Sequence, residues 1–355
     1  MAGIERALFI LNRAAGVGHQ AALVEPLGGR LRAGLPADAS LQIEPVDNHA
    51  QARHTAASFL NASSAPAFVV AGGGGGTLRA VIEGLCEGSS AGLPGPERVR
   101  VTALRMGSGN VLAKQFGVPK DPLAGLDGVL RNLSAGVTAP CCIMRCEARQ
   151  PDGRTAIFHA ATLGGFGQFG RVPGDLARWH RRFPRFHGFS AKVLGIERLT
   201  NVKYGVSLLL RSWHCALWPR AMEEIELRAG DAPPRKMRLL AGALLNFPLR
   251  ALPFRPDLRV QDAALSLHLM PFSRRRDALA LVLAPNIVAR QAVTVRLEAG
   301  ATAQLRLPAG AVAEFFLDED PHVFQEHLTL SVAGTLAFVP GPEYRAPVIE
   351  TGIQT

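Results

Sequence analysis

One stretch of the chain constrains its fold more than any other, because an apolar run enters five consecutive glycines that lead directly into a helical pattern. The stretch reads AFVVAGGGGGTLRAVIEGL and spans residues 67–85. Ala67–Ala71 is predicted to be a buried strand, and apolar residues at helical spacing follow from Thr77. Consecutive glycines leave backbone N–H groups unshielded, and a helix N-terminus carries a partial positive charge. The stretch therefore predicts a phosphate-binding turn, with a ligand-free flexible turn as the alternative.

The first part of the chain repeats this strand–loop–helix pattern four times, which is typical of a parallel sheet with helices on both faces. A second glycine-containing loop, Met106–Asn110, follows the predicted strand Val99–Leu104 and precedes another helix. Two such loops at adjacent strand ends would enclose one nucleotide from two sides. We therefore predict that residues 1–137 form an α/β nucleotide-binding domain.

The pattern changes near residue 138, where short strand-like runs separated by turn residues begin. A chain of 355 residues is long enough for about two domains. We predict an antiparallel β-sandwich over residues 138–335, and one of its expected strands is Val206–Leu210. The remaining residues, 336–355, are expected to form a C-terminal tail that can return to the first domain.

The ends and the cysteines point to the cytoplasm. The N-terminal apolar run Ala7–Leu11 is too short for a signal peptide. Ala278–Ala289, the best candidate for a membrane span, is short and contains Pro285, so no spanning helix is expected. Five cysteines, an odd number without a secretory signal, favour reduced thiols.

Three N-terminal segments together carry a family resemblance. Leu8–Gly18, Gly73–Leu85 and Leu104–Pro119 resemble the diacylglycerol kinase catalytic family, which is similar to the sphingosine and ceramide kinases. The matching positions are Asn12, Gly16, Gly73, Gly74, Gly76, Thr77, Gly107, Gly109 and Asn110. Weaker matches follow at Pro256-Asp257 with Asp262, at residues 317–320 and at residues 338–340.

The resemblance implies an NAD-kinase-like α/β domain, a β-sandwich, and a nucleotide in the cleft between them. It also implies ATP and Mg²⁺, with a hydroxyl of diacylglycerol or of a sphingoid-like lipid as the phosphoryl acceptor. The expected nucleotide-binding residues are Asn12, Gly73, Gly74, Gly75, Gly76, Thr77, Gly107, Ser108, Gly109 and Asn110. Asp257 and Asp262 are candidates for holding a metal ion, and the alternative is that they cap a loop.

One departure from the family pattern concerns the chemistry directly. The motif Gly-Gly-Asp-Gly-Thr has Gly75 in place of its aspartate, and glycine cannot orient a nucleophile. Asp318 and Asp320 are the carboxylates predicted to replace it as catalytic residues, unless their acidic turn is merely solvated. Two functions follow: an active lipid kinase with a displaced acid, or a catalytically degenerate protein that still binds nucleotide or lipid.

A third function class, an NAD-dependent dehydrogenase, rests on the stretch GSGNVLA, which is a weak dinucleotide fingerprint. That class needs an acidic residue at the end of the next strand, about 20 residues further on. The nearest candidate, Asp127, falls inside a helical pattern.

A basic segment, Arg171–Arg198, interleaves arginines with aromatic residues such as Trp179 and Phe183. The whole chain has a formal net charge of +10. Anionic membrane surfaces attract such segments, so we expect the protein to bind a membrane peripherally. An ordinary solvated helix is the alternative. No nucleic-acid-binding motif accompanies the charge, and we expect no nucleic-acid partner.

Overall fold

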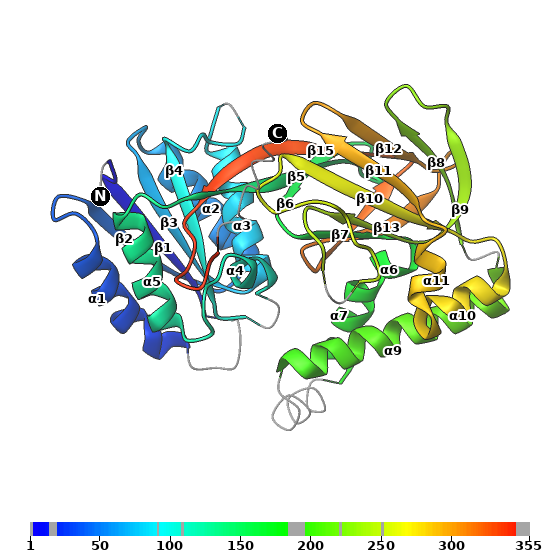
Figure 1. Ribbon diagram of the computed structural model, residues 1–355, viewed down its shortest axis with the longest axis horizontal. Coiled ribbons are helices and arrows are strands. Elements are labelled where there is room, and N and C mark those ends of the chain that lie inside the picture. The colour runs from blue at the N-terminus through cyan, green and yellow to red at the C-terminus, as the bar shows by residue number, and fades with distance from the viewer. Residues whose placement is uncertain are drawn as a thin grey trace, which may run out of the picture.

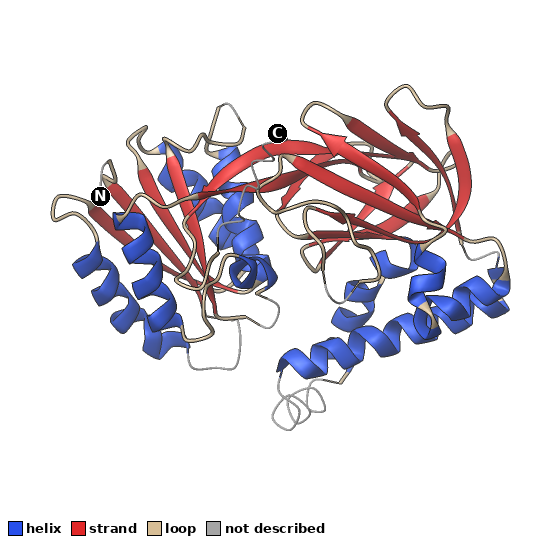
Figure 2. Cartoon of the chain, in the orientation of Figure 1, coloured by secondary structure: helices blue, strands red, loops and turns tan. Residues whose placement is uncertain are grey.

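The protein folds into a helix-flanked parallel sheet followed by a strand-rich region with helices along one side (Figures 1 and 2). The computed structural model describes residues 3–13, 20–90, 92–107, 110–183, 196–219, 222–249 and 252–345. The expected fold class, an α/β part followed by a largely antiparallel β part, is confirmed.

The α/β part contains four parallel strands in the order β4-β3-β1-β2. Every residue of β3 is buried, and the Asn48 side chain caps α2 by accepting a hydrogen bond from the Gln51 N–H. The elements are β1 (Arg6–Asn12), η1 (Gln20–Leu23), α1 (Val24–Gly34), β2 (Ser40–Val46), α2 (His49–Asn61), β3 (Ala67–Gly73), α3 (Gly75–Glu87), β4 (Val99–Arg105), α4 (Val111–Gln115) and α5 (Pro122–Ser134).

The second part is built from antiparallel pairs such as β9–β10 and β13–β14, which enclose an apolar core. Four helices, α7, α9, α10 and α11, lie along one side of its strands (Figure 1). The elements are β5 (Ala139–Arg149), β6 (Thr155–Ala160), β7 (Leu163–Phe166), α6 (Gly167–Gly170), α7 (Val172–Arg182), α9 (Ile196–Leu217), β8 (Glu223–Ala229), β9 (Arg235–Leu245), β10 (Ala264–Pro271), α10 (Arg275–Leu283), α11 (Pro285–Ala289), β11 (Val293–Glu298), β12 (Thr302–Arg306), β13 (Val312–Leu317), β14 (Asp320–Gln325) and β15 (His327–Phe338).

The last strand, β15, belongs to both parts (Figure 1). Most of its length pairs antiparallel with β5 and β12, while its final residues Ala337 and Phe338 pair parallel with β4. The Phe338 ring stacks on Phe116 at a centroid distance of 4.2 Å, and the Gly341 N–H donates to the Phe116 carbonyl at 2.8 Å. The chain thus ends its described course against the first sheet.

The expected strand Val206–Leu210 is wrong, because these residues lie inside α9. A short run of apolar residues does not by itself distinguish a strand from a buried or amphipathic helix. The choice between helix and strand depends on the spacing of apolar residues outside this run, because Val202, Trp213 and Leu217 continue the same helical face.

All five cysteines are free and buried. Cys141, Cys142 and Cys146 lie on β5. Burial raises the pKa of Cys86, Cys142 and Cys146 to about 12. These thiols therefore remain protonated at neutral pH and act as apolar packing groups.

Candidate active site

The glycine-rich turn places the start of α3 at the edge of a pocket. Gly74 is the N-cap of α3 and provides no side-chain hydrogen bond to the first turn. The first N–H groups of a helix have no partner within the helix, so those of Gly75 and Gly76 are suited to an anionic ligand. Gly73, Gly74 and Gly75 line the pocket.

The second glycine loop lies against the first. A Cβ atom placed on Gly107 would lie 2.2 Å from the Cα atom of Gly74, so the two loops approach too closely for a side chain. Asn110 has a left-handed backbone with φ of 47°, and its Oδ1 atom accepts a hydrogen bond from the Gly107 N–H at 3.1 Å. Ser108 and Gly109, which were also predicted to bind nucleotide, lie outside the described residues.

Asn12 and Thr77 connect the remaining motif to the same turn. The Asn12 Nδ2 atom donates a hydrogen bond to the Thr77 hydroxyl at 3.0 Å. A Cβ atom on Gly73 would lie 2.3 Å from that hydroxyl oxygen, which explains why a glycine precedes the cap. The structure therefore gathers the described members of the predicted nucleotide-binding set at the carboxyl edges of β1, β3 and β4.

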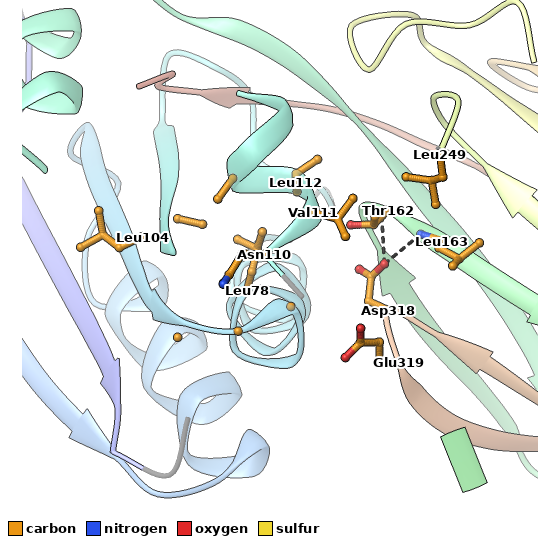
Figure 3. A pocket seen from close by; sticks show the side chains of 15 residues that line it. Leu78, Leu104, Asn110, Val111, Leu112, Thr162, Leu163, Leu249, Asp318 and Glu319 are labelled. Atoms are coloured by element: carbon orange, nitrogen blue, oxygen red, sulfur yellow. Dashed lines mark hydrogen bonds between the residues drawn. The ribbon is translucent and has the colours of Figure 1, made fainter. Parts of the chain in front are cut away.

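An acidic turn between β13 and β14 faces these loops from the second part of the chain. Asp318 is 7% exposed, and its carboxylate accepts backbone N–H groups of Ala161 at 2.8 Å, Thr162 at 3.0 Å and Leu163 at 2.9 Å (Figure 3). Burial raises the pKa of Asp318, although these three donors oppose the shift. Asp318 therefore holds the turn in place through its hydrogen bonds.

Glu319 points into the pocket and away from the donors of Asp318 (Figure 3). Its backbone is left-handed, with φ of 77°, and its side chain remains accessible. Partial desolvation, followed by the nearby charges of Asp318 and Asp320, raises the pKa of Glu319 to about 7. A carboxyl group with such a pKa can exchange a proton near neutral pH.

Asp320 takes part in an ion-pair network that crosses from α3 to the acidic turn. Arg79 on α3 is 4% exposed, and its Nη1 atom donates to the Leu317 carbonyl at 3.0 Å. The same atom lies 3.2 Å from the Asp320 carboxylate and 2.8 Å from His322 Nε2. Burial and then the charge of Arg79 lower the pKa of His322 to about 3, so the imidazole is neutral and accepts this hydrogen bond.

Glu83, one helical turn beyond Arg79, completes this network. It lies 3.3 Å from the Arg79 guanidinium and 2.9 Å from His49 Nε2. These neighbours lower the pKa of Glu83 although its burial opposes the shift. Arg79 thus joins a buried carboxylate of the first part to the turn that carries Glu319.

The candidate metal residues Asp257 and Asp262 lie in the loop before β10, and neither lines the pocket. The Asp262 carboxylate accepts the Arg259 N–H at 2.8 Å, and both acids interact electrostatically with the exposed Arg296. Among the described residues, no group of three or more His, Cys, Asp or Glu side chains could hold a metal ion. Metal binding at Asp257 and Asp262 stays a prediction.

Sequence reasoning missed Arg79, and it placed Glu319 in the acidic cluster without choosing it as a catalytic residue. Glu319 lies between the two predicted carboxylates, and the sequence does not show which member of an acidic triplet faces a pocket. Arg79 follows the glycine motif as an apparently ordinary helical residue. A cation at the buried position of α3, beside Leu78 and Val81, was the available signal.

Comparisons with known proteins agree with this geometry. Residues 6–140 match the model of the diacylglycerol kinase catalytic domain. A candidate diacylglycerol kinase from Bacillus anthracis str. Sterne has a similar structure, with a TM-score of 0.65 and 15% identity over 97% of this chain and 98% of that chain. A second diacylglycerol kinase structure from the same organism gives a TM-score of 0.59 and 14% identity over 97% of this chain and 100% of that chain.

No curated protein sequence matches the chain significantly. The acidic residue that a dehydrogenase would need is not at a strand end, because Asp127 lies in α5 and forms an ion pair with Arg30. The family match covers the two glycine loops, and the structural match extends the fold over nearly the whole chain. Residues 6–140 thus match the diacylglycerol kinase catalytic domain, and the fold of the chain is similar to that of the two bacterial structures.

Proposed function

We propose that the protein is an ATP-dependent lipid kinase that transfers the γ-phosphoryl group to a lipid hydroxyl, such as that of diacylglycerol or a sphingoid-like lipid. One observation carries the proposal: the open N-terminus of α3 and the accessible carboxyl group of Glu319 line the same pocket. Phosphoryl transfer depends on positioning and electrostatics, and this pocket offers both.

The two glycine loops would bind the nucleotide phosphates. The N–H groups at the start of α3 lie beside the Gly107 turn, so one phosphate chain can contact both. Neither glycine at the contact between the loops carries a side chain that would keep a phosphate away from the backbone. Asn12 and Thr77 add hydrogen-bonding groups at the same edge.

Glu319 would act as the general base. Its carboxylate takes the proton of the acceptor hydroxyl, whose oxygen then bonds to the γ-phosphorus. The bond from that phosphorus to the β–γ bridging oxygen breaks, and ADP leaves. Asp318 positions this base through its three backbone hydrogen bonds, and Asp320 does so through Arg79.

A magnesium ion would arrive with the nucleotide. Mg²⁺ is usually held by one or two carboxylates together with substrate phosphates. The two carboxylates at the pocket are already assigned, because Asp318 accepts three backbone N–H groups and Glu319 is the proposed base, so the nucleotide phosphates would hold the ion. When bound, Mg²⁺ would neutralise charge that develops on the transferred group.

A transfer assay tests the proposal directly. Radiolabelled ATP, Mg²⁺ and a mixed lipid extract should yield a labelled lipid product, and omission of Mg²⁺ should abolish it. Absence of any labelled lipid, together with retained ATP binding, would favour the catalytically degenerate alternative.

ATP binding itself is expected to weaken in Gly107→Ala. The new Cβ atom would collide with Gly74, which must move the loops apart. Overpacking of this kind costs about 1–3 kcal/mol, so titration calorimetry should show ATP affinity reduced about tenfold or more. Gly29→Ala is the matched control, since a Cβ atom on Gly29 meets nothing within 4 Å. Equal affinities for both variants would contradict this assignment.

Gly75→Asp separates an active enzyme from a degenerate one. A Cβ atom at this position meets just the Asp318 carbonyl, at 3.9 Å, so the substitution fits sterically. Because Glu319 already supplies the base in our proposal, turnover in a steady-state kinase assay should not rise. A gain of about 10²–10⁴-fold, the usual contribution of general-base assistance, would show that the missing aspartate limits the chemistry.

The basic segment remains our candidate for contact with an anionic membrane. The structure places its first part on α7, where Arg178 pairs with Asp175 at 2.6 Å and Phe183 is 55% exposed. Residues 184–195 lie outside the described residues. Arg181 and Arg182 are exposed and suited to anionic headgroups.

A further inference from the structure

A stripe of large apolar side chains lies on the solvent side of α9. We call it the α9 stripe, and each member is between 42% and 56% exposed. Its members are Val202, Val206, Leu210, Trp213 and Leu217. A soluble helix normally turns such a face toward the core. The stripe is therefore an apolar surface that the fold itself leaves uncovered.

The spacing of the stripe shows that it is one continuous face. Its members follow one another at intervals of four, four, three and four residues. On an ideal helix these positions fall within an arc of about 80°. The buried positions of α9, among them Ser207, Ser212 and Cys215, occupy the opposite side. The helix thus packs on the protein with one face and presents a second apolar face outward.

Neighbouring helices add further exposed apolar groups. Trp218 follows the end of α9 and is 59% exposed. Leu283 at the end of α10 is 77% exposed, and Ile287 on α11 is 61% exposed. The helices α9 and α10 pack against each other, and all three lie along the same side of the second part (Figure 1). An exposed apolar area of this extent marks an interaction surface.

The charges beside this surface are mostly positive. Arg275, Arg276 and Arg290 are exposed, and none of the ion pairs within the described residues involves them. Nearby acids are already engaged: Asp277 is buried and accepts N–H groups of its own helix start, and Asp175 pairs with Arg211 at 2.5 Å. The surface therefore complements a negatively charged partner.

We propose that the α9 stripe rests on an anionic lipid bilayer, with the arginines of α10 and α11 contacting the headgroups. This inference rests on the proposed function, because a lipid acceptor has to be reached at a membrane. None of the helices in the described ranges has the length and apolar character needed to cross a bilayer. Peripheral attachment then requires a surface that combines apolar and basic groups, as this one does.

A second copy of the chain suits this surface less well. A symmetric dimer would bring the same patch of both copies together, and with it the same exposed arginines. Like charges that face each other across an interface oppose association. A bilayer that contains anionic lipid offers both hydrocarbon and negative charge, so it satisfies the apolar and the basic part of the surface at once.

Vesicle co-sedimentation of the full chain tests the inference. The probe is phosphatidylcholine vesicles with and without phosphatidylglycerol. The wild type should bind the anionic vesicles, and the triple variant Leu210→Ser, Trp213→Ser, Leu217→Ser should bind them at least about tenfold more weakly. The control Ile157→Ser, Val312→Ser removes two side chains that are 45% and 47% exposed on β6 and β13, and should bind like the wild type.

Further measurements make the outcomes distinguishable. Arg275→Glu, Arg276→Glu should lose the preference for anionic vesicles, and the triple variant should keep its ATP affinity and its thermal midpoint. Equal losses in the triple variant and in the control, or no vesicle binding by the wild type, would overturn the inference. A vesicle-free dimer that the triple variant abolishes would instead assign the surface to a second copy. Vesicle binding without any lipid phosphorylation would count against the proposed function alone.

Discussion

Glu319→Gln is expected to lower kcat by about 10²–10⁴-fold, the usual contribution of a positioned general base. The substitution keeps the shape of the side chain and removes its ability to accept the hydroxyl proton. KM for ATP should change little, because the N–H groups at the start of α3 are unaffected. Steady-state kinetics with saturating lipid would measure both constants. A variant that retains full kcat would exclude Glu319 as the base.

The pH dependence provides a second measurement on the same residue. The pKa of Glu319 is raised to about 7, and a general base acts in its deprotonated form. Activity of the wild type should therefore fall as pH drops through about 7, and this fall should be absent in Glu319→Gln. Asp320→Asn is the matched control, which should retain a fall in the same direction. A pH profile that is flat in the wild type would contradict the assignment.

The raised pKa also has a consequence for stability. A carboxyl group with a higher pKa in the folded state than in the unfolded state binds more protons when folded. Glu319 therefore favours folding at acidic pH, and its contribution is lost as pH rises from its ordinary value of 4.5 toward 7. The pocket thus keeps a proton-accepting group at some expense of stability at neutral pH.

Arg79→Met is expected to lower the free energy of unfolding by roughly 3–5 kcal/mol, because it leaves the buried carboxylate of Glu83 without its arginine partner on the same helix. Glu83 is 2% exposed and would keep His49, with Arg53 more distant at 3.6 Å. The acidic turn would lose its hydrogen bond from α3 as well. Urea denaturation would measure the loss, and kcat should fall together with it, since Glu319 is no longer held in place.

A double-mutant cycle separates the buried charge from the packing. Glu83→Gln combined with Arg79→Met removes both charges, so the double variant should recover part of the stability lost in Arg79→Met. Strictly additive losses would show that the two side chains do not interact. Arg79→Lys keeps the charge but loses the forked donors, and should lie between the wild type and Arg79→Met.

The sequence predicted the glycine loops well because their requirements are local. Five glycines between a buried strand and a helix leave backbone N–H groups unshielded at a helix N-terminus, and the loop at Gly107 follows the same pattern. Their contact could be anticipated from the rule that the carboxyl ends of parallel strands meet at one edge. The alternation of strands and helices fixed the remaining α/β topology in the same way.

The acidic side of the candidate site could not be predicted in this way, because it depends on contacts between distant parts of the chain. The hydrogen bond from Arg79 to the Leu317 carbonyl joins residues 238 positions apart, and no local pattern reports it. The Asp318 carboxylate accepts hydrogen bonds from the backbone near residue 162. These bonds orient the acidic turn so that Glu319 faces the pocket. Part of the α9 stripe, Val206–Leu210, was predicted to be a strand. Apolar residues usually mark the face of an element that packs on the core, and here they lie on an exposed helix face.

Strand β15 couples the unfolding of the two parts of the chain. Its antiparallel pairs with β5 and its parallel pairs with β4 lie on one uninterrupted strand, so neither part can unravel without disturbing the other. Heating should accordingly melt both in a single cooperative transition. The spacing between the glycine loops and the acidic turn is then kept by a shared strand, which limits how far the two walls of the pocket can swing apart.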